Sequence, residues 1–167
     1  IAGRISTHLP LKGPRSMSMF SLLPLLSFFL LIVLATFVLA NNPRERLNRV
    51  FFHFTVCSAF LAFVEFGLRT APARDQALMW ARLFSVWPLV MSFFLHFVLL
   101  YTKSIRQKAK RIHVALLYTP GISLAAINFW LKADTIIISR QPWVWEFELS
   151  QPPALFYLVN GWAYIVV

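Results

Sequence analysis

The side chains that could do chemistry are few, and most of them lie within apolar sequence. His96 stands near the middle of the run LFSVWPLVMSFFLHFVLLYT, Glu65 comes four residues before Arg69 in another run, and Asn128 lies in a third. Burying such groups in lipid is costly, so they usually face a partner helix or a cavity. His96 is therefore either a neutral imidazole hydrogen-bonded between helices or a group that senses protons or binds a ligand. Glu65 is spaced either for an i,i+4 ion pair with Arg69 or for a ligand contact.

Motifs for the common reaction types are absent from the sequence. A single cysteine, Cys57, excludes an intrachain disulfide and a thiol redox pair. There is no HExxH motif, Cys/His ligand set or acidic cluster for a metal, no glycine-rich phosphate loop and no GxSxG elbow. No lysine lies in an apolar run, so a retinal Schiff base is excluded from this portion. We expect no catalytic residue, no metal site and no cofactor.

The composition places these residues in a membrane protein. Of 167 residues, 59% are apolar and 13% are charged, and there are 17 Phe and 6 Trp. A globular protein carries about 25% charged residues. So much apolar surface exceeds the core of a small domain and must face something other than water. Disorder, a disulfide scaffold and a typical cytosolic enzyme are excluded.

The apolar runs predict an all-α fold, a polytopic transmembrane helix bundle of four full spans and a truncated fifth. Each full run is long enough for the roughly 20 residues that cross a bilayer. Pro24, Pro88 and Pro120 lie within spans and predict kinks. The fifth run stops at Val167, from which we expect the chain to be a fragment. The predicted spans are about 18–40, 48–68, 80–102, 112–131 and 153–167.

Basic residues set the orientation. The loops after the first and third spans hold eight of them, whereas the loops after the second and fourth hold five. By the positive-inside rule the first pair of loops is cytoplasmic and the N-terminus lies outside. The formal net charge of +10 is thus divided between two sides of a bilayer, and we expect lipid and no nucleic acid as partner. The topology-determining residues are Arg44, Arg46, Arg49, Lys103, Arg106, Lys108, Lys110 and Arg111.

Two segments lie outside the spans. Residues 1–16 show no periodicity and precede the first methionine, Met17, so they are a non-native leader, a short outer tail or the remnant of a longer upstream region. After the fourth span, TIIIS, RQP and WVWEFEL predict a short extracytoplasmic β-hairpin. Trp143 and Trp145 are there either as interfacial anchors or as the rim of an outward-facing ligand pocket.

Weak motifs along the chain follow one pattern. They are Asn48, Arg49 and Phe51 at the entry to the second span, Pro88, Phe93 and Phe97 in the third, Tyr101-Thr102-Lys103 at its exit, Pro120 in the fourth, and the Trp-containing outer loop. In these features residues 18 to 167 resemble the N-terminal seven-transmembrane sensor region of membrane histidine kinases and related signalling proteins. One departure is Phe60 or Phe63 at the middle of the second span, where the family often has tryptophan.

The resemblance implies that residues 17–167 are the sensory input domain of a signal-transduction receptor in a prokaryotic cytoplasmic (inner) membrane. Spans 6 and 7 and cytoplasmic output domains in the same chain would follow. This portion would then not be an enzyme, although the complete protein would be a sensor histidine kinase or a cyclase. A homodimer would be ordinary for such a receptor.

A small or lipidic ligand in a pocket under the outer hairpin would act by shifting the helix packing. The ligand-binding candidates, chosen by polarity and position, are Glu65, His96, Asn128, Trp143 and Trp145. Two alternatives remain open: a fragment of a transporter or channel, and a structural membrane subunit that only packs against a partner.

Overall fold

The computed structural model describes residues 19–103, 111–130, 136–140 and 145–149. The predicted leader and the predicted fifth span lie outside these residues. The elements, in chain order, are α1 (Met19–Asn41), α2 (Arg46–Thr70), α3 (Arg74–Leu83), the 3₁₀ turn η1 (Phe84–Val86), α4 (Trp87–Tyr101), α5 (Arg111–Trp130), β1 (Ile136–Arg140) and β2 (Trp145–Leu149).

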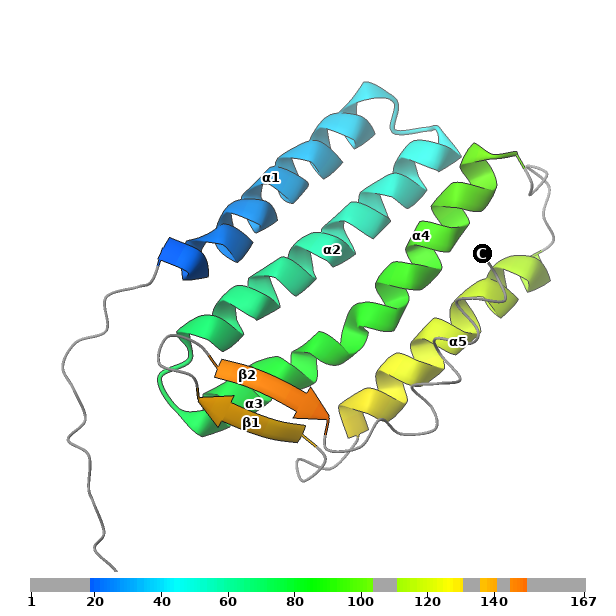
Figure 1. Ribbon diagram of the computed structural model, residues 1–167. Helices are drawn as coiled ribbons and strands as arrows, with labels where there is room; N and C mark the ends of the chain where they lie inside the picture. Colours follow the sequence, from blue (N-terminus) through cyan, green and yellow to red (C-terminus); the bar gives the residue numbers. More distant parts are fainter. Residues whose placement is uncertain (1–18, 104–110, 131–135, 141–144, 150–167) are drawn as a thin grey trace, which may run out of the picture.

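Four helices lie side by side in one layer, in the order α1, α2, α4, α5 (Figure 1). The short turn between α1 and α2 makes these two helices antiparallel neighbours. It is held by the amide of Asn48, whose Nδ2 donates to the carbonyls of Val38 and Asn42, each at 3.2 Å. This explains why an asparagine stands in the first turn of α2: its amide joins the start of α2 to the end of α1.

Three helical stretches are long and apolar enough to cross a membrane. They are Ser21–Asn41, Arg46–Thr70 and Arg74–Tyr101, the last made of α3, η1 and α4 in succession. The apolar part of α5, Val114–Ile127, is shorter. The third span therefore begins at Arg74, six residues before the predicted start, because the polar residues RDQ open the helix that the apolar run continues.

The surface of α1 is that of a helix in hydrocarbon. Large side chains along it are exposed, among them Phe29 at 57% and Val33 at 67%. Small residues occupy the contacts between helices instead, with Ala35 and Ala59 fully buried. Large exposed and small buried side chains are expected in a bilayer. Lipid tails are as apolar as a leucine side chain, so large side chains gain little from burial, whereas small ones let helix backbones pack closely.

Aromatic pairs join α2 to α4. The ring centroids of Phe51 and Phe97 are 5.4 Å apart, and those of Phe54 and Phe94 are 5.6 Å apart. As the residue number rises on α2 it falls on α4, so the two helices are antiparallel. Offset and edge contacts at these distances add specific attraction to the burial of the rings.

The prolines behave in two ways. Pro24 and Pro120 lie inside continuous helices, α1 and α5. Pro88 instead lies in the first turn of α4, directly after η1. A proline in the first turn costs no helical hydrogen bond, because the amides there have no partner within the helix. The predicted kink in the third span is thus a change from α-helix to a 3₁₀ turn and back.

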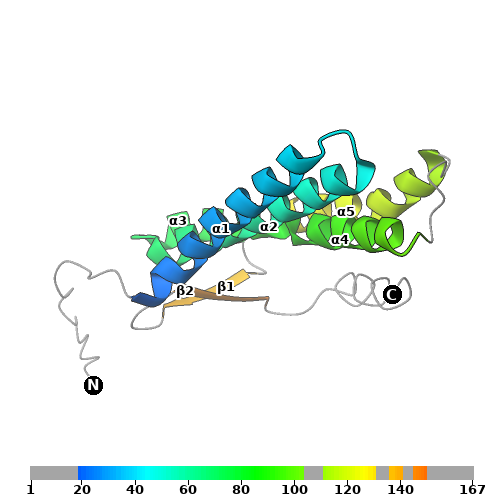
Figure 2. The same cartoon turned by 90° about the horizontal axis from the view of Figure 1, so that it is seen from above.

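The two strands pair antiparallel, with Ile136 opposite Leu149 and Arg140 opposite Trp145. Strand β1 begins and ends one residue later than TIIIS, and β2 starts at Trp145 rather than Trp143. The pair lies beside the end of α2 and beside α3 (Figure 1), on one side of the helix layer when seen from above (Figure 2).

Candidate functional site

His96 is the most connected polar side chain of the described bundle. It is buried, at 5% exposed, and its ring lies between two other helices. Its Nδ1 is 2.8 Å from the hydroxyl of Tyr118 on α5, and its Nε2 is 3.4 Å from Nη2 of Arg46 at the start of α2. We call Arg46, His96 and Tyr118 the polar junction, because these three side chains connect α2, α4 and α5.

The partners of His96 decide its tautomer. A guanidinium can only donate, so Nε2 of His96 must accept from Arg46. The proton of the neutral imidazole then sits on Nδ1 and is donated to the hydroxyl oxygen of Tyr118. A doubly protonated ring would point an N–H at the guanidinium, so the junction holds the neutral ring.

Ring packing supports the same arrangement. The ring of Tyr118 meets that of His96 edge-on at 5.6 Å and that of Phe93 edge-on at 5.0 Å. Phe93 also stacks on His53, at 5.8 Å. The imidazole of His53 donates from Nδ1 to the carbonyl of Arg49 one turn earlier on α2. Aromatic contacts therefore hold the ring of Tyr118 in place beside His96.

The junction lies at the end of the bundle that carries the α1–α2 turn. Arg46 is the first residue of α2, and His96 is in the last two turns of α4, which ends at Tyr101. The expected position of His96 near the middle of its span is therefore wrong. The helix of the third span begins earlier than predicted, and its contact with Arg46 sets His96 at this end.

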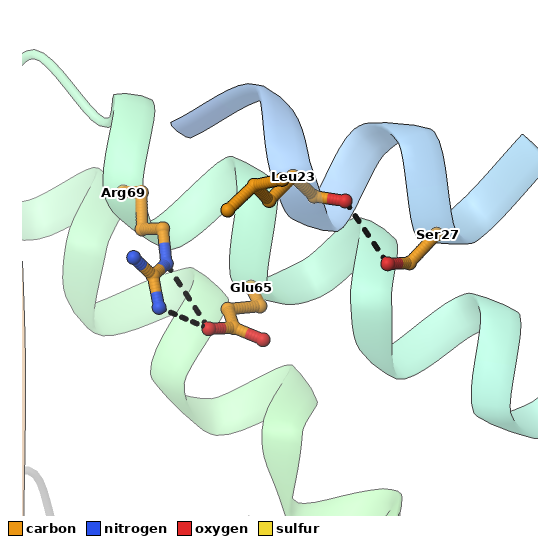
Figure 3. Close-up of polar contacts among 4 residues, drawn as sticks. All are labelled: Leu23, Ser27, Glu65 and Arg69. Atoms are coloured by element: carbon orange, nitrogen blue, oxygen red, sulfur yellow. Dashed lines mark hydrogen bonds and ion pairs between the residues drawn. The ribbon is translucent and has the colours of Figure 1, made fainter. Parts of the chain in front are cut away.

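Glu65 and Arg69 form the predicted pair on α2. Nε of Arg69 donates to Oε1 of Glu65 at 3.0 Å, and Nη2 donates to the same oxygen (Figure 3). Both side chains are partly exposed, at 32% for Arg69 and 40% for Glu65. Glu65 and Arg69 therefore form the i,i+4 ion pair that their spacing allows. The other carboxylate oxygen of Glu65 makes no bond to Arg69.

A small apolar cluster closes the same end of α2 and involves Trp145. The indole Nε1 of Trp145 donates to the carbonyl of Ala71, the residue that caps α2, at 2.8 Å. The cluster is built on Leu68, Ala71, Ala77 and Ala81, with Leu78, Trp80 and Trp145 packed against it. A part-buried hydrogen bond thus joins strand β2 to the end of α2.

Gly67 lets Trp80 approach α2 closely. A Cβ at Gly67 would overlap the indole of Trp80, which also meets the ring of Phe63 edge-on at 5.7 Å. The glycine is needed for space, since its backbone is helical. A second close approach occurs at Gly121 on α5, where a Cβ would meet Oγ of Ser92 on α4.

Two of the five predicted ligand residues, His96 and Glu65, lie far apart. Glu65 lies 19 residues beyond Arg46 on α2, which is about 28 Å along a helix. Glu65 and Trp145 therefore lie at the end of the bundle beside β1 and β2, which we call the hairpin end. His96 lies at the opposite end, with the α1–α2 turn. Asn128 lies near the end of α5, two residues before Trp130. Trp143 lies outside the described residues.

Sequence reasoning missed two members of the polar junction. Arg46 was assigned only to topology, and Tyr118 was not selected at all. Tyr118 could have been found as a tyrosine inside an apolar span, because its hydroxyl needs a partner there. The role of Arg46 required knowledge of which helices are neighbours.

The topology-determining residues that are described lie at one end. Arg44, Arg49 and Lys103 are exposed there, next to the α1–α2 turn and the end of α4. Arg111 begins α5. Arg46, also of that set, belongs to the polar junction, and Arg106, Lys108 and Lys110 lie outside the described residues.

No group of three or more His, Cys, Asp or Glu side chains in the described part of the chain could hold a metal ion. Cys57 is half-buried in α2 as a free thiol.

A row of apolar helices, three of them able to span a bilayer, defines an integral membrane protein of helical-bundle type, and a part-buried polar junction joins α2, α4 and α5. Residues 23–167 match the family described as the N-terminal 7TM region of histidine kinase, and the chain belongs to that family. No curated protein and no solved structure matches the chain.

Proposed function

We propose that residues 17–167 are the input domain of a membrane sensor histidine kinase, which binds a small or lipidic ligand and passes a change of helix packing to cytoplasmic output domains. Membership of the histidine-kinase 7TM family supports the sensory role. The polar junction is the observation that carries the mechanism, because its part-buried hydrogen bonds join three helices and can respond to their relative shift.

Helix α2 is the element that connects the two ends. Its last turn is capped by Ala71, which accepts from Trp145 of β2, and its first residue is Arg46 of the polar junction. A helix of 25 residues spans about 37 Å and transmits a shift or rotation along its axis. A ligand at the hairpin end would thus act on the junction without touching it.

The ligand would bind at the hairpin end, among Glu65, Asn128, Trp143 and Trp145. The partly exposed carboxylate of Glu65 supplies a charged acceptor for such a ligand. His96, the other ligand-binding candidate, would take part in the change of helix packing and would not line the pocket. The ligand must favour one packing over the other, and reversing a 1:99 population needs about 5.5 kcal/mol of differential affinity.

In this proposal α5 is a fourth span and residues 153–167 form a fifth. The hairpin and the N-terminus face outward, the basic loops face the cytoplasm, and the membrane is the inner membrane of a prokaryote. Catalysis would belong to kinase domains of the same chain, and a homodimer would be the signalling unit.

The test uses the complete kinase in native membranes. His96→Ala is expected to change basal autophosphorylation severalfold at unchanged protein level, because it removes both hydrogen bonds of the junction. The matched control is Ser92→Ala, one helical turn earlier on α4, whose hydroxyl bonds only to the carbonyl of Pro88 in its own helix. The control is expected to leave autophosphorylation unchanged.

Two results would contradict the mechanism. An unchanged output in His96→Ala, with only a lower thermal stability, would leave His96 as a packing residue. Equal changes in both variants would show that any disturbance of α4 alters the output and that the junction is not special.

A further inference from the structure

The two ends of the bundle differ sharply in charge. Along the sequence, the segments 41–50 and 102–111, which follow α1 and α4, contain eight basic residues and one acidic residue, Glu45. The rest of the chain after the first span contains five basic and five acidic residues, whose charges cancel. The two segments therefore account for the net charge of the chain after the first span.

The described part of these segments presents its cations outward. Arg44, Arg49 and Lys103 are exposed, and Arg46 lies among them but is partly buried. We call these four residues the basic face. Arg46 and Arg49 lie in the first turn of α2, where the helix dipole disfavours positive charge. The same dipole favours an anion near these residues.

The surroundings of the basic face identify that anion as membrane-bound. Helices able to span a bilayer end here, so the face lies at the level of the lipid headgroups. Tyr101, 69% exposed at the end of α4, is an aromatic residue of the kind that marks this level. Guanidinium groups match the oxygens of a phosphate in pairs, which favours arginine over lysine for such binding.

We infer that the basic face binds the phosphate headgroups of anionic phospholipids in the adjoining leaflet, and that Arg46 links this binding to the polar junction. The inference goes beyond the proposed sensory role and does not depend on it. Since Nη2 of Arg46 also donates to His96, a headgroup and His96 compete for one guanidinium. The charge of the leaflet would then influence how α2, α4 and α5 are joined.

The test measures lipid binding to the purified chain in neutral detergent. Phosphatidylglycerol and phosphatidylcholine are titrated separately, with retained lipid counted by native mass spectrometry and the unfolding midpoint followed in parallel. Phosphatidylglycerol is expected to bind and to raise the midpoint, and its binding is expected to weaken with added KCl. Equal binding of phosphatidylcholine would overturn the inference.

Charge-neutral variants locate the site. Arg44→Gln with Arg49→Gln is expected to weaken phosphatidylglycerol binding about 25-fold, from about fivefold for each charge near an anionic surface. The matched control, Arg74→Gln with Arg82→Gln, removes two exposed arginines from the other end and is expected to change binding less than about twofold. Similar losses in both pairs would refute a localised face.

Inorganic phosphate separates a lipid site from a site for any free anion. Millimolar phosphate is expected to leave both the midpoint and the lipid count unchanged, since it lacks the multiple contacts of a leaflet. Protection by phosphate equal to that by phosphatidylglycerol would overturn the assignment to lipid.

Two further variants test the link through Arg46. Arg46→Gln is expected to weaken phosphatidylglycerol binding about fivefold, as for the other arginines. His96→Leu removes the competitor and is expected to strengthen binding by about fivefold, at the low end of coupling between sites. Unchanged binding in Arg46→Gln, or unchanged or weaker binding in a folded His96→Leu, would refute the link.

Discussion

Replacing Tyr118 by phenylalanine removes one oxygen atom from the polar junction and leaves the ring in place. The ring keeps its edge contact with Phe93 at 5.0 Å, so the loss falls on one bond, from Nδ1–H of His96 at 2.8 Å. His96 is only 5% exposed, and water has little access to replace the acceptor. The other tautomer offers no rescue, because it would aim an N–H at the guanidinium of Arg46, which has only donors.

The expected cost follows from two scales. A buried donor left without an acceptor costs about 1–3 kcal/mol in water-soluble proteins. Hydrogen bonds between membrane helices average about 0.6 kcal/mol and reach about 1.7 kcal/mol, because the unfolded chain also finds partners. For Tyr118→Phe we therefore expect a loss of about 1 kcal/mol in the free energy of unfolding.

The measurement is reversible unfolding of the chain in mixed micelles, followed by circular dichroism as the fraction of denaturing detergent rises. Tyr101→Phe is the matched control, since its side chain is 69% exposed and the same oxygen is removed. Because Tyr101 is exposed, Tyr101→Phe is expected to alter the free energy of unfolding by less than about 0.5 kcal/mol. The double variant with His96→Phe supplies a coupling energy, expected at about 0.5 kcal/mol or more. Equal effects of Tyr118→Phe and Tyr101→Phe, or a coupling of zero, would refute the assigned bond.

Three further outcomes are expected at the hairpin end. Gly67→Ala should lower the free energy of unfolding, measured in the same mixed micelles, by about 1–3 kcal/mol, because the added methyl group overpacks against Trp80. Trp80→Leu in the Gly67→Ala background should restore part of that loss. No loss in Gly67→Ala would contradict the close approach of the two helices. Glu65→Gln should cost less than about 1 kcal/mol, and less again at high salt, because its pair with Arg69 is partly exposed; a larger, salt-independent loss would contradict this. Trp145→Phe should remove about 1 kcal/mol of hydrogen bonding to the cap of α2, seen as faster amide exchange in β2; unchanged exchange would show that the bond does not hold the strand.

Much of the fold could be predicted because each apolar run carries its own signal. A run such as that from Ser21 to Asn41 is long, charge-free and bounded by polar residues, so its helix needs no knowledge of the rest of the chain. The i,i+4 pair of Glu65 and Arg69 is local in the same sense. The family, too, could be recognised from these runs.

The candidate site could be predicted less well, because it depends on contacts between helices. His96 was selected as polar in an apolar run, but its partners are 50 and 22 residues away along the chain, on Arg46 and Tyr118. Polarity alone grouped it with Glu65, although the two lie at opposite ends of the bundle. Spacing along one helix cannot show which end of a neighbouring helix lies beside it.

By itself, the sequence determined that this chain forms apolar helices for a membrane. Each spanning segment must satisfy its own backbone hydrogen bonds and exclude charge, so each segment can be recognised without the others. The tertiary structure decided the order α1, α2, α4, α5, the 3₁₀ turn before Pro88 and the polar junction. The physical reason is that these features rest on side-chain shape and hydrogen bonding between helices. Gly67 is informative only once Trp80 lies against it, and Arg46 changes from a topology signal to a structural donor only once His96 is its neighbour.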